Sequence, residues 1–285
     1  MKIGITGASG QLGRLVVEEL KQRVNPENVI ALVRSPEKVA DLGIGARGFD
    51  YSKPSGLADA LKGIDRLLMI SSSEVGQRKQ QHENIILAAQ KADIQWIVYT
   101  SLLHANESSL SLAPEHLATE ELLKSSGIPH TILRNGWYTE NYTVSIPAAV
   151  KAGALMGSAG HGKISSAPRE DYAEAASIVL TGEGHVGKVY ELAGDLAYTL
   201  KDLAAEVSRQ TGKDIPYNNL TEGEYAGALK SMGIPEGLAQ AIASWDVGVL
   251  KGDLFDDKKV LSQLLGRPTT PMAETVKNAW AQIGK

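Results

Sequence analysis

The first half of the chain alternates short β-branched runs with longer stretches that have the apolar spacing of helices. Strands are expected at residues 2–6, 29–33, 46–49, 66–70, 95–100 and 130–134. Helices are expected between them, at residues 11–22, 36–42, 55–62, 77–92 and 114–125. Strands joined by helices of this length need right-handed crossovers, which build a parallel sheet covered on both faces. The pattern therefore predicts an α/β fold with a doubly wound parallel sheet of the Rossmann type.

Beyond residue 134 this alternation ends. Helical patterns follow at residues 171–180, 200–210, 222–231, 235–245 and 272–283, joined by loops and short strands. Thr199 and Asp202 have the spacing of a capping box, which opens a helix. We therefore expect a nucleotide-binding Rossmann domain over residues 1–135 and a smaller, mostly helical substrate-binding lobe over residues 136–285. A segment at about 160–195 is expected to pack back on the first domain.

Composition restricts the functions that such a fold could have. A chain of 285 residues can bury a sizeable core as one large domain, or as one domain with a lobe. A formal net charge of −4 argues against a surface for nucleic acid or anionic membranes, and we expect no metal site. The lack of cysteine excludes disulfides and thiolate nucleophiles. With neither room for a signal peptide nor an apolar run long enough to span a membrane, we expect a soluble cytoplasmic protein.

The segment ITGASGQLG, residues 5–13, lies between the first expected strand and the first expected helix. Its glycines, Gly7, Gly10 and Gly13, allow a tight turn that brings backbone N–H groups to a pyrophosphate at the positive end of the helix. The spacing is typical of short-chain and extended dehydrogenases, and the Gly-Lys-Ser/Thr ending of a P-loop is missing. A turn without a ligand is the alternative. The predicted dinucleotide contacts are Gly7, Ala8, Ser9, Gly10, Gln11 and Leu12.

The end of the second expected strand distinguishes the two nicotinamide dinucleotides. An NAD site places Asp or Glu there, because a carboxylate accepts hydrogen bonds from the ribose hydroxyls. This chain has Arg34 at that position and Lys38 in the following helix. A guanidinium can bind a 2′-phosphate through two hydrogen bonds, so we expect NADPH in preference to NADH. The alternative is that Arg34 is a solvated surface charge.

The fourth expected strand leads into a run of three serines. In an open parallel sheet, ligands bind at the carboxyl ends of the strands. Ile70, Ser71 and Ser72 are therefore expected along the ribose path of the cofactor. A polar loop without ligand contacts is the alternative.

Seven segments between residue 4 and about residue 195 are distinctive: GITGASGQLG, ALVRSPEK, LLMISSSEVGQR, YTSLLHA, LRNGWYTENY, REDYAEAA and KVYELAGD. Together they resemble the NmrA-like branch of the atypical short-chain dehydrogenases, and within it the bacterial NADPH-dependent quinone oxidoreductases. The resemblance implies that the loop after the sixth strand passes the nicotinamide. It implies pocket residues Asn135, Gly136, Trp137, Tyr138, Thr139, Glu140, Arg169 and Tyr172. From the residues alone, Trp137 and Tyr138 could equally be packing residues, although a flat quinone ring would stack on an aromatic wall.

Typical short-chain dehydrogenases carry a Tyr-x-x-x-Lys motif after a Ser or Thr at the end of the fifth strand, and its tyrosine delivers a proton to a carbonyl oxygen. Ser101 occupies the hydroxyl position here, but no such motif follows. The corresponding helix has His116 and Glu120 at the same spacing. A carboxylate in the lysine position would not activate its neighbour and would repel a phosphate. This departure argues against ordinary alcohol dehydrogenation.

Quinone reduction does not require that motif, because the product is aromatic and positioning supplies much of what the reaction needs. His104 and His116 are the candidate proton donors, although either could be a packing or surface histidine and water could serve instead. One dinucleotide fingerprint is visible and none for a flavin, so we expect direct hydride transfer from NADPH to a quinone. The alternatives are a non-catalytic NADP(H)-sensing regulator that binds a protein partner, and a reductase or isomerase for another small carbonyl compound. Monomer and dimer both stay open.

Overall fold

The computed structural model describes residues 1–283, so the last two residues of the predicted C-terminal lobe lie outside the described part. The chain divides into two compact units. Unit 1 consists of Met1–Ala105, Leu112–Asn135 and Arg169–Glu191. Unit 2 consists of Asn106–Ser111, Gly136–Pro168 and the residues from Leu192 onward.

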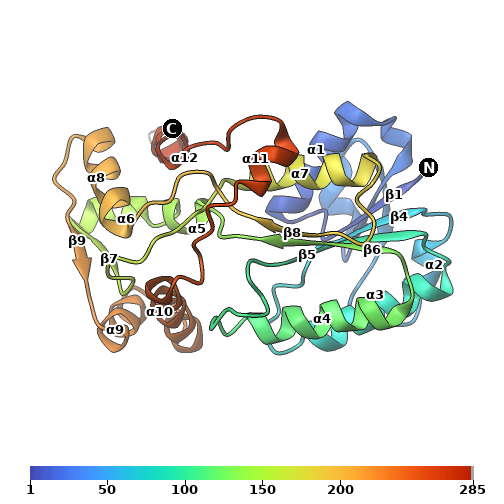
Figure 1. The fold of residues 1–285 in the computed structure, drawn as a ribbon, viewed down its shortest axis with the longest axis horizontal. Coiled ribbons are helices and arrows are strands. Elements are labelled where there is room, and N and C mark those ends of the chain that lie inside the picture. Colours follow the sequence, from blue (N-terminus) through green and yellow to red (C-terminus); the bar gives the residue numbers. More distant parts are fainter. Residues whose placement is uncertain (284–285) are drawn as a thin grey trace. The chain divides into compact units, whose positions relative to one another are not determined.

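Unit 1 is built around a seven-stranded sheet with the order β3-β2-β1-β4-β5-β6-β8 (Figure 1). The strands are β1 (Ile3–Thr6), β2 (Val29–Val33), β3 (Gly45–Gly48), β4 (Arg66–Met69), β5 (Trp96–Leu102), β6 (His130–Asn135) and β8 (Val189–Leu192). Neighbouring strands run parallel, and β1 pairs with β2 on one side and β4 on the other. The strand order reverses between β1 and β4, which is where open sheets of this kind bind ligands. The predicted doubly wound α/β fold is confirmed.

Helices cover both faces of this sheet (Figure 1). On one face, α1 (Gln11–Arg23) packs against α7 (Arg169–Thr181). On the other face lie α2 (Leu57–Leu61), α3 (Arg78–Lys91) and α4 (Ala113–Ser126). An apolar cluster that includes Leu67, Ile85, Ile97 and Leu123 fills the space between this second layer and the strands. Each fully buried side chain of this size contributes about 1.5–3 kcal/mol, so the core fixes the strand ends that form the site.

Unit 2 is mostly helical, as predicted. Its helices are α5 (Glu140–Thr143), α6 (Ile146–Ala152), α8 (Leu200–Thr211), α9 (Glu222–Ser231), α10 (Glu236–Lys251), α11 (Val260–Leu265) and α12 (Met272–Ile283). Two short parallel strands, β7 (Leu155–Gly157) and β9 (Tyr217–Asn219), accompany them. The predicted capping box at the start of α8 is confirmed: Thr199 Oγ1 accepts the Asp202 N–H at 3.2 Å, and Asp202 Oδ2 accepts the Thr199 N–H at 2.9 Å.

A buried carboxylate lies on α10. Asp246 is 5% exposed, and its Oδ2 accepts a hydrogen bond from the Ser158 N–H at 2.8 Å. Burial raises the pKa of Asp246 to about 6, because a carboxylate loses hydration when it leaves water. Asp246 is therefore an ionisable group that unit 2 holds at a cost in stability.

The observed elements differ from the predicted ones in several places. Residues 36–42 form a 3₁₀ helix, η2 (Pro36–Leu42), which is broken at Val39, rather than an α-helix. A second 3₁₀ helix, η1 (Pro26–Asn28), precedes β2. Helix α10 runs to Lys251, six residues past its predicted end, because apolar spacing continues through Val249. Strands β7, β8 and β9 were not predicted, since three or four residues are too few to show an alternating pattern.

Within residues 1–283, no helix combines the length and the apolar character needed to cross a bilayer. In the same range, the His, Asp and Glu side chains form no cluster that could hold a metal ion.

Candidate cofactor site

The glycine loop joins β1 to α1. Gly7 has a φ of +62°, a left-handed conformation that suits glycine, and its N–H donates to Leu32 O at 3.1 Å. Its carbonyl accepts the Gly10 N–H at 2.9 Å, which closes the turn. A Cβ on Gly13 would collide with Gly7 O and lie 2.7 Å from Ala8 Cα, so the third glycine lets α1 approach the loop. At Gly10 a Cβ would meet only Gly7 O, at 3.3 Å.

The start of α1 has the features of an anion-binding helix N-terminus. Gly10 is the N-cap and has no side chain to accept the first helical N–H groups, and the first turn holds no acidic residue. These N–H groups and the positive end of the helix can therefore bind a phosphate. Of the predicted contacts here, Ser9, Gly10 and Gln11 are exposed, whereas Ala8 and Leu12 are buried.

Arg34 directly follows β2, and its side chain is 73% exposed. Its Nη1 lies 3.3 Å from Glu74 Oε1, an ion pair that the sequence did not suggest. Lys38 is exposed on η2, and its carbonyl accepts a hydrogen bond from Arg14 at 2.6 Å. The Arg14 guanidinium also binds Asp41, so it anchors the segment that carries Lys38 to α1.

Two threonines hold the chain where β4 ends. The Ile70 N–H donates to Thr6 Oγ1 at 2.9 Å, and the Ser71 N–H donates to Thr100 Oγ1 at 3.0 Å. Thr6 and Thr100 belong to β1 and β5, the neighbours of β4 in the sheet. The predicted ribose-path residues are thus fixed by strand ends on both sides.

Ser72 is buried, and its polar groups bind the protein itself. Its N–H donates to His82 Nε2 at 2.9 Å, while its hydroxyl donates to Gln81 Oε1 and accepts the Glu74 N–H. Burial lowers the pKa of His82 to about 3, so the imidazole is neutral. Because Nε2 accepts, the proton sits on Nδ1, which is 2.8 Å from Thr119 Oγ1 and donates to it. Ser72 therefore anchors the loop after β4 to α3 and α4.

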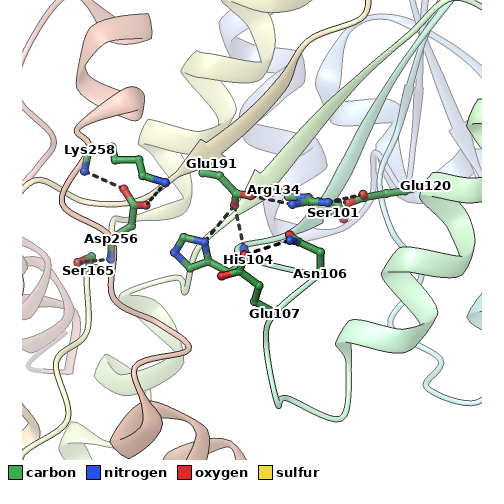
Figure 2. A network of polar contacts seen from close by, with 10 residues as sticks. All are labelled: Ser101, His104, Asn106, Glu107, Glu120, Arg134, Ser165, Glu191, Asp256 and Lys258. Atoms are coloured by element: carbon green, nitrogen blue, oxygen red, sulfur yellow. Dashed lines mark hydrogen bonds and ion pairs between the residues drawn. The ribbon is translucent and has the colours of Figure 1, made fainter.

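The position of the missing Tyr-x-x-x-Lys motif is occupied by an ion network (Figure 2). The Ser101 hydroxyl donates to Glu120 Oε1 at 2.5 Å. Arg134 binds Glu120 through two hydrogen bonds, of 3.0 and 2.7 Å, and Glu191 through a third, of 2.8 Å. The hydrogen bonds that Glu120 and Glu191 accept from Arg134 raise the pKa of its guanidinium above the ordinary value. The negative charge of Glu120, which we expected to repel a phosphate, is thus balanced by Arg134.

The two candidate proton donors have different surroundings. His116 is 5% exposed, its Nδ1 lies 2.8 Å from the Tyr99 hydroxyl, and burial lowers the pKa of its imidazole to about 3. His104 has a side chain that is 21% exposed and a left-handed backbone with a φ of +52°. Its N–H donates to Glu191 Oε2 at 2.8 Å, and its Nδ1 lies 3.8 Å from the same oxygen (Figure 2). Of the two, only His104 has an imidazole within reach of solvent.

The residues suggested by the family resemblance fall in both units. Asn135, at the end of β6, and Arg169 and Tyr172, on α7, belong to unit 1, where Tyr172 is 1% exposed. The five that belong to unit 2 are Gly136, Trp137, Tyr138, Thr139 and Glu140. The structure therefore brings the glycine loop, Arg34 and Ile70–Ser72 to one sheet edge in unit 1.

Within unit 2, Trp137 meets Trp245 edge to face, with ring centroids 5.6 Å apart. The Trp245 indole N–H donates to Ser111 Oγ at 3.0 Å, which fixes that ring. Thr139 is fully buried, and its hydroxyl lies 2.8 Å from Ser166 Oγ. The sequence did not reveal Trp245, although its position at the end of a predicted helix could have drawn attention to it.

The residues of unit 1 fit a dinucleotide phosphate. The first turn of α1 offers N–H groups without a competing carboxylate, and Gly13 allows the close approach of loop and helix. An exposed guanidinium stands at the end of β2, where a 2′-phosphate would need a cation.

Comparisons with known proteins agree with an NAD(P)H-binding fold. A family model described as NAD(P)H-binding matches residues 7–181. The chain is 54% identical over 279 residues to quinone oxidoreductase 2 of Escherichia coli (strain K12), which covers 97% of this chain and 98% of that protein. The crystal structure of the E. coli NADPH-dependent quinone oxidoreductase QOR2 complexed with NADPH matches with a TM-score of 0.95 and 54% identity, over 98% of this chain and 99% of that one. Triphenylmethane reductase of Citrobacter sp. matches with a TM-score of 0.94 and 36% identity, over 99% and 100% of the two chains.

The chain belongs to the NAD(P)H-binding family, and the resemblance drawn from its motifs is confirmed.

Proposed function

We propose that this protein is an NADPH-dependent quinone oxidoreductase. The observation that carries the proposal is the 54% identity, over nearly the full length of both chains, to a quinone oxidoreductase. The solved structure of a protein with that activity, complexed with NADPH, has the same fold over 98% of this chain. The cofactor-binding features of unit 1 support the same conclusion.

In this proposal unit 1 binds the cofactor. We assign the pyrophosphate to the loop Gly7–Leu12 and the start of α1, because the first N–H groups of that helix have no side-chain cap and its first turn holds no acidic residue. Arg34 and Lys38 hold the 2′-phosphate. Ile70 and Ser71 follow the ribose, and Ser72 keeps their loop in place through His82.

In this proposal unit 2 supplies the substrate side, and the pocket roles that the resemblance implies for Arg169 and Tyr172, in unit 1, stay predictions. We assign Asn135, at the end of β6, and the segment that follows it to Glu140 to the nicotinamide side, where Trp137 offers a ring that Trp245 braces. When bound, NADPH supplies the hydride. The protein orients the quinone and lets a proton reach the reduced oxygen, either from the His104 imidazole or from water.

The proposed activity is tested by following NADPH oxidation at 340 nm with and without 1,4-benzoquinone. Quinone-dependent oxidation is expected, with NADPH preferred over NADH. In the Arg34→Ala variant this preference should fall by about 1–3 kcal/mol, the strength of a hydrogen bond to a charged group. NADPH binding without any quinone-dependent oxidation would favour a non-catalytic NADP(H)-sensing regulator instead. The quinone partner, the cytoplasmic location and the oligomeric state stay predictions.

A further inference from the structure

The Arg34–Glu74 ion pair spans the sheet edge above the glycine loop. In the order β3-β2-β1-β4, Arg34 follows β2 and Glu74 lies in the loop after β4, with β1 between them. The two side chains meet at 3.3 Å, so the pair bridges the carboxyl end of β1, where the strand order reverses. This is the position at which a dinucleotide would lie.

The two partners are held differently. Glu74 Oε2 accepts a hydrogen bond from Gln81 Nε2 at 2.7 Å, and Gln81 is 3% exposed. The Glu74 N–H also donates to Ser72 Oγ at 3.1 Å. The Arg34 side chain, in contrast, is 73% exposed, and Glu74 is its partner in the structure. Gln81 therefore restrains the carboxylate, whose side chain is 46% exposed, whereas the more exposed guanidinium can turn away from it.

A 2′-phosphate and the Glu74 carboxylate compete for one guanidinium. An exposed ion pair is weak, so a phosphate that offers two charge-assisted hydrogen bonds can replace the carboxylate on Arg34. Because Gln81 keeps Glu74 in place, the displaced carboxylate stays close to the incoming phosphate and repels it. NADH has no 2′-phosphate, so it does not compete with Glu74 for Arg34 and brings no phosphate there for the Glu74 carboxylate to repel.

We propose that Glu74 is a specificity-determining residue that limits the preference of this protein for NADPH over NADH. The inference rests on the proposed function, in which Arg34 binds the 2′-phosphate. Glu74 weakens the binding of NADP(H) and so favours release of the oxidised cofactor after each turnover.

The test is the Glu74→Gln variant, which keeps an amide oxygen for Gln81 and removes the charge. The dissociation constant of NADPH should fall by about 3- to 10-fold, while that of NADH changes by less than about twofold. The dissociation constant of adenosine 2′,5′-bisphosphate should fall in the same way as that of NADPH, whereas that of AMP should not. The gain should shrink in 1 M salt, where the screening length is about 3 Å. Binding is measured by calorimetry, without quinone.

The matched control is Glu27→Gln, an exposed carboxylate beside the amino end of β2 with the same change in net charge. Three results would overturn the role of Glu74. They are an equal gain in affinity for NADPH and NADH, an unchanged affinity for NADPH, and a gain in NADPH affinity in Glu27→Gln as well. Arg34→Ala separates this inference from the proposed function. If Arg34→Ala weakens NADPH while Glu74→Gln has no effect, only the inference on Glu74 fails. If Arg34→Ala leaves the preference for NADPH intact, the assignment of the 2′-phosphate to Arg34 fails first.

Discussion

Replacing the buried carboxylate of unit 2 by an amide should stabilise the protein at neutral pH. The gain in stability should be much smaller in acid, where the carboxylate is protonated. Asp246 is 5% exposed and accepts one hydrogen bond, from the Ser158 N–H. Among residues 1–283, no cation pairs with it. In Asp246→Asn the amide oxygen can accept the same hydrogen bond, and the buried charge is removed.

The magnitude follows from the pKa of Asp246, which burial raises from 3.8 to about 6. The folded state holds the proton more tightly than the unfolded state does. Stability is therefore greatest below the unfolded pKa and falls as the pH rises through the folded one. A difference of about two pKa units corresponds to a loss on the order of 3 kcal/mol above pH 6. Asp246→Asn should recover this free energy, which would raise the Tm by roughly 5 °C or more.

The assay is thermal unfolding of both proteins at pH 7.5 and at pH 4, followed by circular dichroism. The variant should melt at a higher temperature than the parent at pH 7.5, and most of the difference should vanish at pH 4. Asp214→Asn, at an exposed position in unit 2, is the control and should change little at either pH. A gain of the same size at both pH values would refute the reasoning, because it would not come from the charge.

Three further predictions concern the site. Gly10→Val should leave the fold intact, since its Cβ would meet only Gly7 O at 3.3 Å. It should raise the dissociation constant of NADPH about tenfold or more in a fluorescence titration. Normal binding by the folded variant would mean that the loop is only a turn. If positioning carries the reaction, His104→Ala and His116→Ala should each slow quinone turnover by less than about tenfold in stopped flow, against 10²–10⁴-fold for an essential acid. Trp137→Ala should slow it more, and a thousandfold loss from one histidine would contradict this mechanism. Arg134→Met should destabilise the protein by about 1.5–3 kcal/mol in urea unfolding, because the partly buried Glu120 and Glu191 lose their counter-charge. An unchanged midpoint would show that this network carries little stability.

The architecture of unit 1 could be predicted because each of its features is local in sequence. Alternating strands and helices, and the three glycines after β1, are visible within short windows. Strand β8 was missed because its four residues lie at the sheet edge, where Val189 is exposed and the alternation is lost. Its place beside β6 depends on hydrogen bonds such as that from the Ile132 N–H to Lys188 O, which link distant parts of the chain.

The site was harder to predict, because a sequence shows residue types without their partners. Glu191 lies 57 positions from Arg134, and Glu74 lies 40 positions from Arg34, so neither ion pair follows from a motif. Ser72 illustrates the same limit. Its hydroxyl was expected beside a ribose, but it is engaged by Gln81 from the buried side of α3.

The discontinuous sequence of unit 1 has a consequence for its synthesis. The Rossmann sheet receives its last strand, and α1 its packing partner α7, only from residues Arg169–Glu191. After Asn135 has left the ribosome, more than fifty further residues must be made before that segment exists, which takes roughly 3 to 10 seconds. Through that interval the edge of β6 is unpaired and the surface of α1 that packs against α7 is uncovered. The nascent chain is then open to strand pairing with its neighbours on a polysome, and we expect it to be a client of ribosome-associated chaperones.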